Sequence, residues 1–171
     1  MYDPTIFENL KVAFENHIYD LDNIDQEIII QNREDRMDFA TLARRLSIQF
    51  ILVDEPEVTV ELIVEASLED LAGEILEAPG VNPGCSLLLR FQKQLNLQLA
   101  KQCEQIEQAL HSIWEDDIHL TQTLSFVYGQ DSTYMDNIEV KFKPKLTEEH
   151  MREIPGFLKS VLTSLEQLNR I

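Results

Sequence analysis

Hydrophobic residues near the start of the chain recur every three or four positions, the spacing of one face of an α-helix. They are Ile6, Phe7, Leu10, Phe14 and Ile18. Asp3 followed by Pro4 is typical of a helix start, with Asp3 as the N-cap and proline at the first helical position. The pattern therefore predicts a helix from Pro4 to about His17.

Elsewhere apolar and polar residues alternate, as they do in strands with one buried face. Two such runs, 46–52 and 58–64, are separated by Pro56 and predict a hairpin or meander. Two further runs, at 118–128 and 138–142, predict a second hairpin. It is the most clearly patterned β-structure in the chain.

The region before the first of these hairpins has a weaker pattern. A β-branched run at 27–32 predicts a short strand, ended by the turn-like residues 33–36. The segment 37–45 fits either a strand with a bulge or a short helix, because its apolar residues match both periods. We favour the strand.

Three more helices are predicted. Ser67 and Asp70 match a capping box, which predicts a short helix over 68–77. The segment 86–114 is rich in helix-forming residues and predicts one long amphipathic helix. Its apolar stripe consists of Phe91, Leu95, Leu99, Cys103, Ile106, Leu110 and Trp114. A leucine-rich stripe over 157–168 predicts a final helix.

Together these elements predict a single α+β domain over residues 1–171. We expect a mostly antiparallel sheet of about five to six strands, with helices packed on one face. An uninterrupted helix over 86–114 would be longer than a domain of this size is wide. It would therefore either break or project and offer surface to a partner.

Charge narrows the range of functions. The chain has 31 acidic and 14 basic residues, a net charge of -17. Such a chain repels phosphate backbones and anionic lipids at long range, so nucleic-acid and membrane-surface binding are not expected. The acidic residues are spread along the chain, which favours a role in solubility. The more specific interpretations of the negative charge are binding to a basic partner and mimicry of a nucleic acid.

Cysteine usage and the N-terminal residues favour a cytoplasmic location. The first residues show neither a basic segment nor an apolar segment of the kind found in signal peptides. Cys85 and Cys103 are the two cysteines and lack CxxC spacing. A secreted domain usually carries more disulfides.

No motif assigns catalytic residues or a cofactor. The five glycines form neither a GxGxxG nor a P-loop pattern, and GxSxG is missing. Cys85 precedes the predicted long helix, where a thiol would ionise more easily. No histidine can be assigned as its base, so a small residue at a loop–helix junction is the favoured interpretation, and Cys103 is predicted to lie in the core.

An acidic cluster with one histidine follows the predicted long helix. Glu115, Asp116, Asp117 and His119 could ligate a cation, but the ligand pattern of a calcium loop is missing. Acids at a helix C-terminus also oppose its dipole, which explains why the helix would end there. No metal site is therefore predicted. The remaining histidines, His17, His111 and His150, are expected on helix surfaces.

Two basic clusters have structural explanations. Lys141, Lys143 and Lys145 could form a docking strip, but lysines on a strand more often prevent edge-to-edge pairing. The arginines of the second cluster are expected to pair with nearby acids, since no aromatic residues interleave them for base stacking. They are Arg33, Arg36, Arg44 and Arg45.

These observations favour a non-enzymatic protein-interaction domain, in the form of a small acidic chaperone or adaptor. The predicted helix 86–114 and the C-terminal leucine stripe could pair across a two-fold axis to form a homodimer. They could also hold a segment of another protein. The alternatives are an enzyme or metal-binding protein built from scattered carboxylates and His119, and an inhibitor that mimics nucleic acid.

Overall fold

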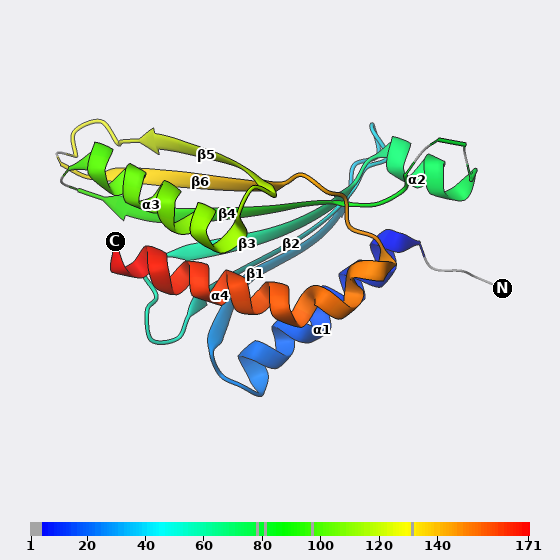
Figure 1. Ribbon diagram of the computed structural model, residues 1–171, viewed down its shortest axis with the longest axis horizontal. Coiled ribbons are helices and arrows are strands. Elements are labelled where there is room, and N and C mark those ends of the chain that lie inside the picture. Colours follow the sequence, from blue (N-terminus) through cyan, green and yellow to red (C-terminus); the bar gives the residue numbers. More distant parts are fainter. Residues whose placement is uncertain (1–4, 78, 81, 97, 131) are drawn as a thin grey trace.

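A computed structural model describes residues 5–77, 79–80, 82–96, 98–130 and 132–171. Six strands form one sheet in the order β1-β2-β3-β4-β6-β5, and every neighbouring pair is antiparallel (Figure 1). The strands are β1 (Ile28–Met37), β2 (Arg44–Leu52), β3 (Thr59–Ala66), β4 (Ser86–Leu95), β5 (Ile118–Ser125) and β6 (Tyr134–Phe142). The protein therefore has the predicted α+β fold.

Helices cover one face of this sheet. Figure 1 shows α1, α3 and α4 on the same side of the strands, with α2 at one end of the sheet. The helices are α1 (Ile6–Asn23), α2 (Leu68–Ile75), α3 (Leu99–Trp114) and α4 (Ile154–Arg170), the last preceded by the 3₁₀-helix η1 (Glu148–Glu153). Thr5 caps α1 by accepting a hydrogen bond from the backbone of Glu8, whereas the predicted cap Asp3 and Pro4 lie outside the described residues.

The core lies between the helices and the covered face. Register brings apolar residues from neighbouring strands into continuous rows, one of which is Ile48, Leu62, Leu89 and Val140. All four side chains are fully buried. The apolar stripe of α4 packs onto these rows, because Leu158, Val161, Leu162, Leu165 and Leu168 are all buried. The C-terminal stripe therefore belongs to the core and leaves no leucine face for a two-fold partner.

The opposite face of the sheet carries a ladder of charges across four strands. Arg45 on β2 faces Glu61 and Glu65 on β3, and Arg90 on β4 lies between Glu61 and Glu139. Lys141 extends the ladder along β6. Each contact is between 3.5 and 3.7 Å. The acids of this face therefore alternate with bases and do not form an array of negative charge.

The largest correction concerns the predicted helix over 86–114. Its first part is the interior strand β4, and only Leu99–Trp114 is helical. Within β4 the buried side chains are Leu87, Leu89, Phe91, Lys93 and Leu95, a strict alternation. The segment is a strand because it lies between β3 and β6, and sheet pairing outweighs its intrinsic preference for helix.

The region before β2 also differs from expectation. Strand β1 continues through residues 33–36 to Met37, where a turn was predicted. The segment 37–45 is neither one strand nor a helix, because it contains the β1–β2 turn. Asp38 stabilises that turn by accepting hydrogen bonds from the backbone of Ala40 and Thr41. Both hairpins and the capping box of Ser67 and Asp70 are confirmed, although β5 ends at Ser125 and residues 126–128, predicted as strand, belong to the turn.

Among the described residues, no helix combines the length and the apolar character needed to cross a bilayer.

Candidate interaction surfaces

Cys85 is buried and has no features of a reactive thiol. Its backbone pairs with Leu146 in an isolated bridge, and its side chain is 1% exposed. It precedes a strand, so the helix dipole expected to activate the thiol is not there. Burial, followed by the nearby charges of Asp70 and Glu74, raises the pKa of Cys85 to about 12. The thiol is therefore protonated and hidden at neutral pH.

The acidic cluster after α3 does not converge on a metal. Glu115, Asp116 and Asp117 are exposed in the tight connection to β5. His119 is exposed on β5, where it faces Lys141 in register. In the described part of the chain, no three His, Cys, Asp or Glu side chains come together as a metal site.

The three other histidines serve different local roles. His150 accepts a hydrogen bond from the backbone of Thr147 and completes the cap of η1. His111 lies in the last turn of α3, near the carbonyl of Glu115. His17 lines a cleft of about 320 Å³ beside Asp20, Asp25 and Glu27 at the end of α1. In this cleft a histidine and several acids border the same hollow.

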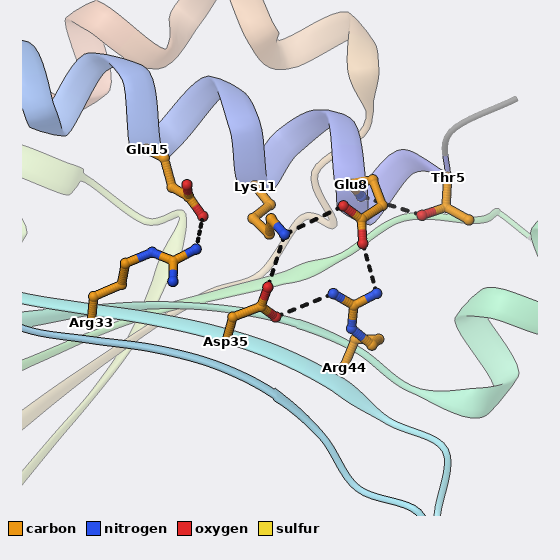
Figure 2. Close-up of polar contacts among 7 residues, drawn as sticks. All are labelled: Thr5, Glu8, Lys11, Glu15, Arg33, Asp35 and Arg44. Atoms are coloured by element: carbon orange, nitrogen blue, oxygen red, sulfur yellow. Dashed lines mark hydrogen bonds and ion pairs between the residues drawn. The ribbon is translucent and has the colours of Figure 1, made fainter. Parts of the chain in front are cut away.

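The predicted pairing of the arginine cluster with local acids is confirmed. Four residues of α1, β1 and β2 join in a compact network with Arg44 at its centre (Figure 2). Arg44 donates to Glu8 at 2.7 Å and to Asp35 at 3.1 Å, while Lys11 donates to Asp35 at 2.8 Å. Beside this network, Arg33 donates to Glu15 at 2.6 Å. We call Glu8, Lys11, Asp35 and Arg44 the α1 clamp, because they tie α1 to β1 and β2.

The electrostatics of the α1 clamp indicate a structural role. Burial acts to raise the pKa of Asp35, but hydrogen bonds from Lys11 and Arg44 outweigh it and hold that pKa below its ordinary value. A carboxylate held in its charged form by two cations is a weak general base at neutral pH. The network therefore stabilises the docking of α1 and offers little for proton transfer.

Helix α2 is docked with its polar side toward the domain. Its buried residues are Asp70 and Gly73. Asp70 accepts hydrogen bonds from Ser67 and from Lys145. One turn later, Glu74 accepts a hydrogen bond of 2.9 Å from the backbone of Ile6, the first residue of α1. Polar contacts thus hold α2 together with Leu71, which is partly buried against the core, whereas a helix at a protein surface usually buries its whole apolar stripe.

The apolar side of α2 consequently faces outward. Leu68, Ile75 and Leu76 are 49%, 68% and 74% exposed. Leu68 and Ile75 lie seven residues apart and therefore on the same side of the helix, opposite Asp70. We call these three residues the α2 surface. Acidic residues border it, because Glu69 and Glu77 are exposed beside them.

The β1–β2 turn adds apolar residues at the same end of the sheet. Met37, Arg44 and Ala66 lie in one register row, so this turn is only two strands away from the start of α2. Phe39 is 86% exposed, and Met37 and Leu42 are nearly half exposed. Exposed apolar groups gathered at one end of a molecule are typical of interaction sites.

A second exposed apolar group lies at the opposite end, on the β5–β6 hairpin. Leu124 and Met135 are about 40% exposed on the strands, and the turn exposes three consecutive residues. These are Phe126, Val127 and Tyr128, at 69%, 62% and 97%. Phe126 packs edge-to-face on Tyr134 with ring centroids 5.9 Å apart, so the aromatic turn is ordered by its own side chains.

Beneath α3 lies an unusual buried carboxylate. Asp136 on β6 is fully buried, and both its carboxylate oxygens lack a hydrogen-bond partner among the described residues. Burial raises the pKa of Asp136 to about 6. Lys93, its register partner on β4, is also buried, and burial lowers the pKa of that lysine. This inward-facing pair was not singled out in the sequence, where it interrupts the apolar alternation of β4 and β6.

Comparisons with protein-family models, with curated proteins and with solved structures found no match for this chain.

Proposed function

We propose that this protein is a non-enzymatic interaction domain of the cytoplasm, an adaptor or chaperone that holds a segment of a partner protein on its α2 surface. The observation that carries the proposal is the orientation of α2. Asp70 and Glu74 anchor the helix to the domain, so Leu68, Ile75 and Leu76 are left facing solvent.

Exposed apolar side chains of this size can contribute substantially to binding. Full burial of a leucine or isoleucine side chain stabilises a complex by about 1.5–3 kcal/mol before the costs of association. Ile75 and Leu76 are both more than two-thirds exposed and neighbour each other at the C-terminal end of α2. A partner that covered them would therefore gain most of that contribution at two adjacent positions.

Charge selects the kind of segment that fits. Glu69 and Glu77 border the α2 surface, and the whole chain carries a net charge of -17. Acidic borders attract basic residues and repel acidic ones, which speeds encounter and discriminates between partners. We therefore expect a partner segment whose apolar residues are flanked by lysine or arginine.

The proposal is tested by affinity capture from the protein's own cells at moderate salt, with three immobilised baits. They are the natural chain, the double variant Ile75→Ser/Leu76→Ser, and the matched control Val12→Ser/Ile24→Ser. Val12 and Ile24 are 49% and 71% exposed but belong to α1 and the residue after it. Both variants should fold, because surface substitutions of this kind usually change stability by about 0.5 kcal/mol or less.

We expect one protein to be retained by the natural chain and the control and lost from the α2 variant. A synthetic peptide covering its basic amphipathic segment should bind the natural chain, and binding should weaken as salt is raised. Equal capture by all three baits, or a partner segment that is acidic, would contradict the proposal.

A second candidate function rests on the cleft beside His17. A histidine next to Asp20, Asp25 and Glu27 could bind a cationic metabolite or transfer protons. A thermal-shift screen of metabolites and divalent cations, repeated with His17→Asn, tests it. A ligand that stabilises the natural chain and not the variant would favour this function. The nucleic-acid mimic gains no support, since the acids of the open sheet face alternate with Arg45, Arg90 and Lys141.

A further inference from the structure

We propose that two copies of this chain pair through the open edges of β5, around a two-fold axis at Gln122, to form one continuous antiparallel sheet. This inference concerns the edge of the sheet farthest from α1 and does not depend on the α2 surface.

The two edges of the sheet differ in chemistry. Edge strand β1 carries four consecutive charged residues, 33–36, and its register with β2 shifts between Ile30 and Asn32. Charges and irregular register are devices that prevent a sheet edge from pairing with another chain. Edge strand β5 has neither feature. Its pairing with β6 is continuous from Ile118 to Ser125, and it contains no Asp, Glu, Lys or Arg.

The absence of acidic, lysine and arginine residues continues beyond the end of β5. No Asp, Glu, Lys or Arg occurs from Ile118 to Gln130, although charged residues make up 26% of the chain. Figure 1 shows β5 as the outermost strand, with no helix or strand beyond its free edge. Alternate backbone groups of an edge strand point outward, so β5 presents donors and acceptors that a further strand would satisfy.

Geometry selects the register of the pairing. In an antiparallel pair centred on Gln122, Leu120 of one copy faces Leu124 of the other, because positions equidistant from the axis lie opposite each other. The same rule brings Ile118 opposite Phe126, just beyond the strand. Leu124 is 40% and Phe126 is 69% exposed in the single chain, so this register covers apolar surface at both ends of the pair.

The other face of the paired strands contains no Asp, Glu, Lys or Arg side chain in this register. Thr121 faces Thr123, and His119 faces Ser125, each twice by symmetry. A centre one residue away, at Thr121, would place Leu124 opposite Ile118 but Leu120 opposite the polar Gln122. Centring on Gln122 therefore gives the larger number of apolar pairs on the helix-covered face.

The distribution of charge favours a second copy of this chain as the partner at the β5 edge. Two molecules with a net charge of -17 repel each other, and acids directly opposite each other across strands are destabilising. The β5 edge is a surface on which both copies can meet without opposing acids. A two-fold arrangement also requires a self-complementary patch, and a neutral antiparallel strand with paired leucines meets that requirement.

The test measures mass in solution by sedimentation equilibrium for variants that place like charges across the axis. Thr121→Lys/Thr123→Lys and Thr121→Glu/Thr123→Glu each oppose identical charges in both threonine pairs, while an equal mixture of the two opposes lysine to glutamate. Gln92→Lys/Gln94→Lys is the control, because both residues are exposed on the same face of the interior strand β4. Circular dichroism establishes that every variant is folded.

We expect the natural chain and the β4 control to have twice the 19.8 kDa mass of one chain. Each β5 variant alone should have the mass of one chain, and the mixture should recover the doubled mass. A natural chain that stays at 19.8 kDa at the highest concentration attainable overturns the proposal. So does a dimer that persists in the lysine variant, or a mixture of folded variants that does not associate.

Discussion

The ammonium of Lys145 donates to the carboxylate of Asp70, and this contact joins the segment after β6 to the polar side of α2. Burial acts to raise the pKa of Asp70, but the hydrogen bonds from Lys145 and Ser67 outweigh it and leave the pKa lowered. Asp70 therefore both caps α2 and determines which side of the helix faces solvent.

Replacing Asp70 with Asn should loosen α2. The variant keeps the shape of the side chain but removes its charge, so it should lower the free energy of unfolding by about 1–3 kcal/mol. Amide hydrogen exchange of α2 should accelerate more than that of α4. Lys143→Met is the control, since Lys143 is exposed. An unchanged exchange rate in α2 would show that the helix does not depend on this contact.

The same pair gives a pH dependence of defined sign. A carboxylate whose pKa is lower in the folded state contributes stability above its unfolded pKa and loses it as the pH falls through the folded value. In the natural chain, exchange of α2 should therefore accelerate below about pH 4. In Asp70→Asn this acceleration should be reduced, as hydrogen exchange followed by mass spectrometry across that range would show.

Replacing Asp136 with Asn should stabilise the protein at pH 7.5. The folded pKa of about 6 lies above the ordinary 3.8, so the natural chain loses stability as the pH rises from about 4 to 6 and has the full penalty above that. A difference of this size corresponds to roughly 3 kcal/mol, an upper value because the amide is also buried. Urea unfolding at pH 7.5 and pH 4 should show a gain that nearly vanishes at the lower pH.

Asp117→Asn is the matched control for that experiment, because Asp117 is exposed. It should give no gain at pH 7.5. If Asp136→Asn were destabilising at pH 7.5, the carboxylate would have a partner that compensates its charge.

Removing the guanidinium of the α1 clamp should weaken the attachment of α1. Arg44→Met leaves Glu8 and Asp35 with Lys11 as their remaining cation and also removes the cation that lies 4.7 Å from the ring centroid of Phe7. We expect a loss of about 1–2 kcal/mol by urea unfolding. Arg36→Met should cost less than about 0.5 kcal/mol, because the Arg36–Glu34 pair is largely exposed. Equal losses would argue against the clamp.

The two cysteines should differ in reactivity. Cys85 is buried with a pKa of about 12, whereas Cys103 is partly exposed. Burial, followed by the nearby charge of Asp136, raises the pKa of Cys103 too, so alkylation at pH 8 should be slow but should modify Cys103 first. Peptide mapping by mass spectrometry measures both rates, and in urea the two should become equal. Faster labelling of Cys85 in the folded chain would contradict its placement.

The sequence predicted those elements whose local pattern agrees with their tertiary environment. The hairpin of β5 and β6 alternates cleanly, and Ser67 with Asp70 caps α2 by contacts within one turn. Strand β4 was mistaken for a helix because its residues favour helix and Lys93 occupies an inward position. Only the neighbouring strands make the alternation of Leu87, Leu89 and Phe91 decisive.

The α2 surface could not be predicted from the sequence for a related reason. A periodic stripe of apolar residues in a helix normally identifies its buried side. That inference fails for Leu68 and Ile75 of α2. The contacts that turn the polar side of this helix toward the domain come from Lys145 and from the backbone of Ile6, both about seventy residues away in sequence. No local signal distinguishes Leu68 and Ile75 from core residues.

The unequal edges of the sheet also limit how far assembly can proceed. Strand β1 carries four consecutive charges, 33–36, and a shift of register, so it cannot serve as a template for another strand. A molecule with a single edge strand able to pair can bind one further copy, and the resulting dimer has no open edge for another. Two such edges would allow growth into fibres. If two copies pair through β5 as we propose, the charges of β1 stop the doubled sheet from adding further strands and growing into an aggregate.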